Sequence, residues 1–224
     1  MTLGCRIAKR MRAVPAEMIE QFRSLPVANV SDVMSRLSGG GADLRPMHGG
    51  GVLAGPALTV RTRPGDNLMI HKAIDLAEPG DIIVVDAGGD LTNAMIGELM
   101  LAHATRRGVG GFVIHGAIRD VAIIRAQPVP VYAVGITHRG PYKDGPGEIN
   151  YPIAIEGMVI APGDLMLGDD DGVLCVPFEQ TQTVLVAARA KQAAEEAQMA
   201  ATLAGTSDRS YIDKTLAKLG CEMP

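Results

Sequence analysis

The 224-residue sequence has no tryptophan, and only 3% of its residues are aromatic. Its core must therefore come from Val, Ile, Leu, Ala and Met, which make up most of its 47% hydrophobic residues. The sequence also lacks any apolar run close to the ~18 residues that a membrane-spanning helix needs. We therefore expect no membrane partner.

Basic residues are not in excess, since the net charge is −4 at pH 7. Nucleic-acid-binding proteins usually carry a basic domain or stripe, so we expect no nucleic-acid partner. A basic cluster at residues 6–12, RIAKRMR, has no apolar stretch behind it of the kind found in signal peptides. Cysteine is scarce, and Cys5, Cys175 and Cys221 are too widely spaced to indicate a metal pair or a disulfide framework. These features predict a cytoplasmic protein.

What is present is a chain long enough for one substantial core, with 27 glycines scattered between apolar runs. We expect a single α/β domain over residues 1–179, which includes N-terminal helices, and a helical arm over residues 180–224. Strand and helix patterns alternate between residues 82 and 136, and this alternation is typical of an α/β fold.

Local patterns predict individual elements. Helices are expected over residues 15–25 and 67–77, with another helix that has Ser31 as its N-cap, and a strand is expected over 52–63. The triplet Pro-Gly-Asp occurs at 64–66, 79–81 and 162–164. Pro and Gly favour a tight turn, so each triplet is predicted to mark the entry to a strand.

Two charged residues follow the apolar segment GGFVIHG (110–116), where α/β proteins often bind ligands. These are Arg119 and Asp120, and one interpretation is a local salt bridge at the start of a short helix. A second acidic residue, Glu98, follows Gly97 and the glycine-containing segment VVDAGGD (84–90). Because adjacent strands would end at one edge, we expect Glu98, Arg119 and Asp120 to share a crevice.

These residue types suit a 2-oxo acid. A carboxylate can hold Mg²⁺ through one or two oxygens and water. An arginine can stabilise the negative charge that develops on an enolate oxygen. Unpaired N–H groups at the start of a helix, here around Gly97–Met100, can bind a carboxylate.

Three segments carry a family resemblance: residues 80–120, PVPVYAVG (128–135) and VIAPGDLMLGDDDGVLCVP (159–177). They resemble the class II 4-hydroxy-4-methyl-2-oxoglutarate / 4-carboxy-4-hydroxy-2-oxoadipate aldolases, a family that includes RraA-type regulators of ribonuclease E. The resemblance runs from about Ala28 to Ala200. Its most specific motif is an acidic residue, then a spacer, here residues 99–118, and then Arg-Asp.

The resemblance implies roles for the motif residues. Asp120 would be the direct ligand of Mg²⁺ or Mn²⁺, and Arg119 would contact the carbonyl of pyruvate. Backbone amides that align with Leu99 and Met100 would hold the pyruvate carboxylate, and Gly97 would be a further substrate-binding residue of this segment.

Further roles concern water around the metal. Glu98 stands where the family usually has Asp, and it would orient metal-bound water. An acidic residue of a neighbouring subunit, Glu195 or alternatively Glu196, would complete the water shell. Many relatives have Asp in place of His115, whose role stays open.

The resemblance also implies a layered β-β-α sandwich like the swivelling phosphohistidine domain, assembled as a trimer or hexamer. The arm would pack on a neighbouring subunit. The expected activity is cleavage of 4-hydroxy-2-oxo acids to pyruvate through an enolate, with oxaloacetate decarboxylation as a side activity. The alternative is a non-catalytic RraA-type regulator that binds ribonuclease E.

Other motifs favour structural interpretations. VDAGGD (85–90) has Asp90 where an S-adenosylmethionine-binding loop needs glycine, so we do not expect it to bind that cofactor. Lys72 is expected to be a solvated lysine and not a residue that forms a Schiff base. GDDDG (168–172) is expected to be a hairpin turn, and residues 140–153 either line the site or turn the chain. The residues expected to be structural or on the surface are Cys175, His48, His71, His103 and His138.

Overall fold

The structure is a computed structural model that describes residues 4–36, 39 and 41–222. It contains two compact units, Met1–Ala188 and Arg189–Pro224. The α/β class is confirmed, whereas the likeness to the phosphohistidine domain stays a prediction. In the described part of the chain, every helix is too short or too polar to cross a bilayer.

The first unit is built on a mixed sheet with the strand order β1-β7-β3-β4-β5-β6-β2. Its centre is parallel: β3 pairs with β4, β4 with β5, and β5 with β6. The carboxyl ends of these strands therefore lie at one edge. The strands of the path are β1 (Cys5–Ile7), β2 (Arg45–Pro46), β3 (Leu53–Thr62), β4 (Ile82–Asp86), β5 (Gly111–Ile118), β6 (Val131–Ile136) and β7 (Gly147–Ile149).

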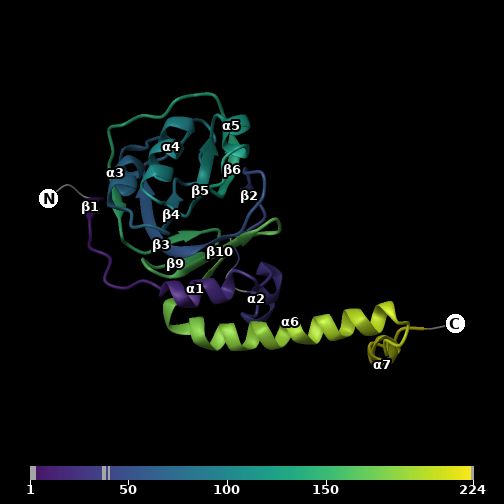
Figure 1. The fold of residues 1–224 in the computed structure, drawn as a ribbon. Coiled ribbons are helices and arrows are strands. Elements are labelled where there is room, and N and C mark those ends of the chain that lie inside the picture. The colour runs from purple at the N-terminus through teal and green to yellow at the C-terminus, as the bar shows by residue number, and fades with distance from the viewer. Residues whose placement is uncertain (1–3, 37–38, 40, 223–224) are drawn as a thin grey trace. The chain divides into compact units, whose positions relative to one another are not determined.

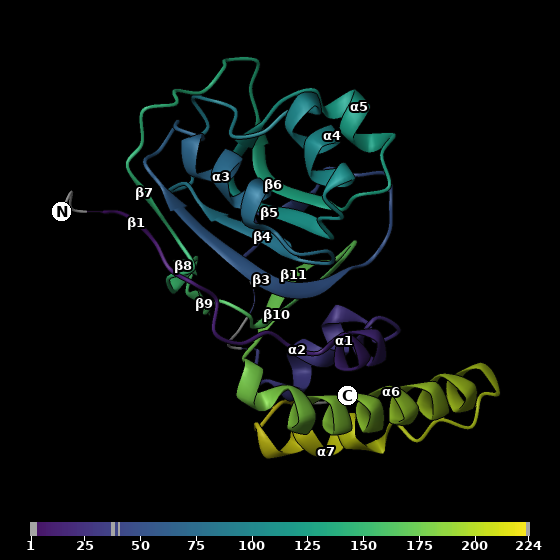
Figure 2. The same ribbon diagram turned by 60° about the vertical axis from the view of Figure 1, so that its left-hand side comes forward.

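Three helices cover one face of this sheet, α3 (Leu68–Leu76), α4 (Glu98–Arg106) and α5 (Val121–Arg125), as Figures 1 and 2 show. Side chains alternate along each strand, so Ile83 and Val85 face these helices and pack with Ile70 and Leu101. This buried cluster fixes α3 and α4 against the sheet next to its carboxyl edge.

Two hairpins cover the opposite face. They are β8 (Ile153–Ile155) with β9 (Met158–Ile160), and β10 (Leu165–Asp169) with β11 (Gly172–Val176). In β10 Met166 packs towards the central sheet, whereas Leu165 and Leu167 pack with the N-terminal helices. The β10–β11 hairpin is therefore buried on both faces, whereas β8 and β9 each expose their middle residue. The predicted turn at residues 168–172 is confirmed, because Asp169 pairs with Gly172 across the hairpin.

The N-terminal helices are α1 (Ala16–Phe22) and α2 (Val27–Val33). The prediction that Ser31 caps the second helix is wrong, because Ser31 lies inside α2. The helix begins after Pro26, whose ring presets a backbone angle suited to this position. Its first N–H, from Val27, donates to Oδ2 of Asp169 at 2.9 Å, a tertiary cap that sequence spacing does not reveal.

Two of the three Pro-Gly-Asp triplets lead into strands, β4 and β10, as predicted. The triplet at 64–66 does not, because α3 follows it. The reason is that Oδ1 of Asp66 accepts the N–H of Leu68 at 3.0 Å and so satisfies the start of a helix.

The long helix α6 (Thr181–Leu203) follows a 3₁₀ turn at Phe178–Gln180, and α7 (Ser210–Lys218) comes last. Both helices lie within residues 180–224, where a helical arm was predicted. The buried residues of α6 are Thr181, Val184, Leu185 and Ala188, all within the first unit. Among the described residues of the second unit none is buried, so this unit has no core of its own. Its packing on a neighbouring subunit stays a prediction.

Candidate active site

The end of β5 positions the Arg-Asp pair. The strand ends at Ile118, and Asp120 follows in a left-handed conformation with φ 59° and ψ 34°. Asp tolerates this region better than most residues because its short side chain can hydrogen-bond locally. The left-handed turn takes the chain directly from β5 into α5.

The segment before α4 runs along the same strand end. Met95 N–H donates to Ala117 O at 2.8 Å, and Arg119 N–H donates to Ile96 O at 3.1 Å. These bonds bring the start of α4 to Asp120, whose Oδ2 accepts the N–H of Glu98 at 2.9 Å. The structure thus brings Glu98, Arg119 and Asp120 together, although Glu98 arrives through the segment beside β5 and not directly from the end of β4.

Gly97 is the N-cap of α4, and it is buried against the pair. A Cβ at this position would overlap Oδ2 of Asp120 and would lie 3.0 Å from Cγ of Arg119. Its φ of −154° is open to any residue. Glycine is therefore required here for space and not for backbone conformation.

The local salt bridge also exists, with Arg119 Nε 3.7 Å from Asp120 Oδ2. Asp120, however, makes no side-chain bond to its own helix α5. Its carboxylate instead satisfies the first N–H of α4. The pair is thus built into the junction of two helices, and it is more than a helix-opening ion pair.

A cavity of about 160 Å³ opens beside this junction. Four of the predicted substrate-binding residues line it, namely Arg119, Gly97, Leu99 and Met100. Glu98 and Asp120 adjoin these residues but do not line the cavity. The remaining wall residues are Asn67, His71, Ala94, Ile96, Pro141 and Lys143.

The first turn of α4 offers hydrogen-bond donors to this cavity. The N–H groups of Leu99 and Met100 have no acceptor among the described residues, as expected for a helix start. The N–H of Leu101, one position further on, bonds to Gly97 O at 3.1 Å and begins the helical ladder. Two donors and the positive end of the helix dipole therefore remain available for an anion.

The charged groups of the wall make it attractive to anions. Burial, and then the nearby charge of Lys143, lower the pKa of His71 below its ordinary value of 6.5. The imidazole is therefore neutral at pH 7, and Arg119 and Lys143 carry the positive charges of the wall. No carboxylate is among the lining residues.

Six of the lining residues were not predicted as site residues, and three of these are polar: Asn67, His71 and Lys143. Residues 67–77 show only a helical period, and residues 140–153 show no period at all. Pro141 and Lys143 confirm that the loop at 140–153 lines a cavity. Asn67 is 2% exposed, and its Oδ1 has no hydrogen-bond partner among the described residues.

A metal ion would find few protein ligands here. Among the residues that the structure describes, no three or more His, Cys, Asp or Glu side chains are grouped so that they could hold a metal ion. Asp120 is half-exposed, and its Oδ1 accepts no hydrogen bond from the described residues. One free carboxylate oxygen fits Mg²⁺, which commonly keeps several waters and binds through one or two carboxylates.

Three other residues from the sequence analysis, Glu195, His115 and Cys175, do not line this cavity. Glu195 is on α6 in the second unit, where it pairs with Lys191 at 2.9 Å, and its place in another subunit's site stays a prediction. His115 does not line the cavity, and its Nδ1 lies 3.6 Å from Asp86 Oδ1. Cys175 is a buried core residue, and burial followed by the nearby Asp164 raises its pKa. It is therefore a poor nucleophile.

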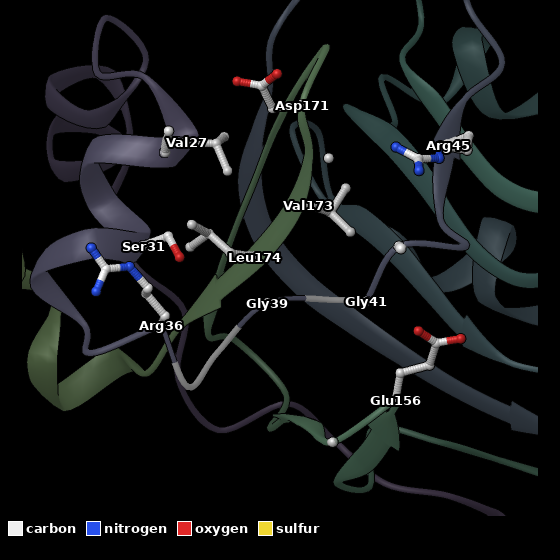
Figure 3. A pocket seen from close by; sticks show the side chains of 14 residues that line it. Val27, Ser31, Arg36, Gly39, Gly41, Arg45, Glu156, Asp171, Val173 and Leu174 are labelled. Atoms are coloured by element: carbon white, nitrogen blue, oxygen red, sulfur yellow. The ribbon is translucent and has the colours of Figure 1, made fainter. Parts of the chain in front are cut away.

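A larger hollow of about 650 Å³ lies between α2 and the two hairpin turns. Figure 3 shows its charged side chains, Arg36, Arg45, Glu156 and Asp171, standing apart from one another. They do not converge on a point, as a catalytic constellation must. The smaller cavity beside Arg119 is therefore the candidate active site.

Comparison with known proteins identifies the family of the chain. The family model described as "RraA-like: Aldolase/RraA" matches residues 27–175. A Halalkalibacterium halodurans protein named "Putative 4-hydroxy-4-methyl-2-oxoglutarate aldolase" is 39% identical over 92% of this chain and 99% of its own length.

Two solved structures have a similar fold. A Pseudomonas syringae protein described as uncharacterized has a TM-score of 0.78 at 25% identity, over 87% of this chain and 96% of its own. Streptomyces coelicolor RraAS2, described as an unusual member of the RNase ES inhibitor RraA protein family, has a TM-score of 0.75 at 26% identity, over 83% and 96%. The chain therefore belongs to the RraA-like (aldolase/RraA) family.

Proposed function

We propose that this protein is a divalent-metal-dependent lyase that cleaves 4-hydroxy-2-oxo acids to pyruvate. One observation carries the proposal. Arg119 lines the same cavity as Leu99 and Met100, whose N–H groups have no acceptor among the described residues. A 2-oxo acid presents a carboxylate and an adjacent oxo group, which these two kinds of donor match.

In this proposal the N–H groups of Leu99 and Met100 bind the C1 carboxylate. Arg119 then donates to the 2-oxo oxygen, where negative charge grows as the bond between C3 and C4 breaks. The electron pair of that bond forms the enolate of pyruvate, and the C4 hydroxyl gives its proton to a water molecule as it becomes a carbonyl. A proton added at C3 completes pyruvate.

Asp120 would hold Mg²⁺ or Mn²⁺ through its free oxygen, and Glu98 would orient water near it. When bound, the cation supplies positive charge that polarises the 2-oxo group. The residues of the chain supply the rest, since they orient the acid and neutralise the enolate. The same arrangement would serve oxaloacetate, which loses CO₂ to give the same enolate.

The test measures pyruvate release from 4-hydroxy-4-methyl-2-oxoglutarate and from oxaloacetate, with MgCl₂ or with EDTA. We expect release that needs the metal and that falls to background in Asp120→Ala. Asp171→Ala is the matched control, because this exposed aspartate lies in the turn between β10 and β11. It should retain wild-type activity.

If neither acid releases pyruvate in a metal-dependent way, the proposal is overturned. That result would favour a non-catalytic binding role, like the one in the description of Streptomyces coelicolor RraAS2 as a member of the RNase ES inhibitor RraA protein family.

A further inference from the structure

The loop that carries Lys143 is fastened to the start of α3. Tyr142 N–H donates to Gly65 O at 2.8 Å, and Asn67 N–H donates to Tyr142 O at 3.0 Å. The loop between β6 and β7 is therefore held next to residues 65–67 through both backbone polar groups of Tyr142.

A buried carboxylate adds two more bonds. Asp66 is fully buried, and its Oδ2 accepts the N–H of Asp144 at 2.7 Å and the N–H of Gly145 at 2.9 Å. Charge-assisted bonds of this kind are stronger than neutral ones. The backbone on each side of Lys143 is thus fixed, although the side chain of Lys143 is exposed.

The ammonium group of Lys143 is not used by the fold. The adjacent Asp144 pairs with Arg63 at 3.8 Å, and Lys143 forms no ion pair with the described residues. A cation that is held at a cavity wall and lacks a counter-ion is suited to bind an anion from solution.

The proposed function leaves the second carboxylate of a dicarboxylic substrate without a partner. The N–H groups of α4 bind the C1 carboxylate, and Arg119 binds the 2-oxo oxygen. His71 is neutral at pH 7 because burial, and then Lys143, lower its pKa. Lys143 is therefore the one cationic wall residue that remains for a second carboxylate.

We propose that Lys143 binds the second carboxylate of a dicarboxylic 4-hydroxy-2-oxo acid and makes the site selective for such substrates. This inference rests on the proposed function, because it takes the orientation of the substrate from it. Lys143 is a specificity-determining residue: it contacts the part of the substrate that leaves and takes no part in breaking the bond.

The experiment compares two substrates in the same variant. One is the dicarboxylate 4-hydroxy-4-methyl-2-oxoglutarate, and the other is the monocarboxylate 4-hydroxy-2-oxopentanoate. In Lys143→Met we expect kcat/KM for the dicarboxylate to fall about tenfold or more, which corresponds to one lost charge-assisted hydrogen bond. The value for the monocarboxylate should stay within about twofold of wild type.

Two further variants serve as controls. Lys143→Arg keeps the charge and should restore most of the preference for the dicarboxylate. Lys72→Met removes another exposed lysine, which is on α3 but does not line the cavity, and it should change neither value. An equal fall for both substrates in Lys143→Met, or no fall for either, would overturn the inference.

A binding measurement separates this inference from the proposed function. Calorimetry with MgCl₂ would compare 2-oxoglutarate with 2-oxopentanoate, which differ in a terminal carboxylate against a methyl group. A wild-type protein that binds 2-oxoglutarate more tightly, and loses this preference in Lys143→Met, supports the inference even if it cleaves nothing. Equal affinity for the two acids in the wild type overturns it.

Discussion

The N–H of Glu98 donates a hydrogen bond of 2.9 Å to Oδ2 of Asp120. Glu98 is the first residue of α4, and Asp120 comes two residues after the end of β5, so this bond joins the helix to the strand end. It occupies one carboxylate oxygen and leaves the other free. It also holds the start of α4 so that the next two N–H groups remain open to a ligand.

Gly97→Ala tests how closely this junction is packed. The new Cβ would overlap Oδ2 of Asp120 and crowd Cγ of Arg119, so both side chains must move. A displacement near 1 Å can cost about 10²-fold in rate, and we expect kcat to fall by about that factor. The free energy of unfolding should fall by only about 1 kcal/mol, because the extended backbone of Gly97 accepts alanine.

The control for this change is Gly39→Ala, since no heavy atom lies within 4 Å of a Cβ built at Gly39. It should leave both kcat and the urea midpoint unchanged. Full activity in Gly97→Ala would show that the tight contact is unimportant for turnover.

Arg119→Lys tests whether the planar guanidinium acts on the developing oxyanion. Lysine keeps the charge but loses the fork of parallel donors. We expect kcat for pyruvate release to fall about 10²-fold or more, by analogy with the loss of an oxyanion-hole donor. Steady-state kinetics would decide, because a change confined to KM would mean that Arg119 binds ground state and transition state equally.

Mixing inactive variants tests whether neighbouring chains share a site. Asp120→Ala lacks the proposed metal ligand, and Glu195→Ala lacks the proposed contribution from another subunit. If Glu195 acts across subunits, mixed oligomers contain some sites with both residues intact, and activity should partly return after the two variants are unfolded and refolded together. Recovery in this assay should depend on the mixing ratio. Persistent inactivity of every mixture would point to a site within one chain.

The partly buried His71 predicts a pH dependence of stability. Its folded-state pKa lies below 6.5, first because of burial and then because of Lys143, so the unfolded chain takes up the proton first as the pH falls. The stability that His71 contributes is therefore present above pH 6.5 and is lost as the pH falls through its folded-state pKa. Urea unfolding at pH 7.5, 6.5 and 5.5 should show a smaller loss in His71→Gln than in the wild type.

His138→Gln provides the comparison, because His138 is exposed at the end of β6 and away from the helix that carries His71. It should follow the wild-type pH dependence. An unchanged loss of stability in His71→Gln would show that this histidine does not titrate differently in the folded protein.

Some parts of the site follow from sequence reasoning for a simple reason. Residues that come directly after parallel strands lie at one edge of a sheet, so the position of Arg119 and Asp120 after β5 could be predicted. The position of Glu98 was harder to predict, because eleven residues (87–97) separate β4 from α4. Its placement depends on that segment running beside β5, which Met95 and Ile96 establish through backbone bonds.

Other parts could not be predicted because their partners are distant in the chain. Ser31 has the residue type of an N-cap, but α2 begins earlier because Pro26 and the carboxylate of Asp169 define its start. His71 shows only a helical period in the sequence. It lines the cavity because α3 lies beside α4.

The sequence by itself determined the alternation of strands and helices, the apolar core without tryptophan, and the acidic and basic residues that follow β5. These features are local, and they depend on the chemistry of neighbouring residues. Only the tertiary structure decided that Lys143 lies at the same cavity as Arg119. The buried carboxylate of Asp66 fastens a loop that is almost eighty residues further along the chain, and no periodicity in the sequence encodes a contact of that range.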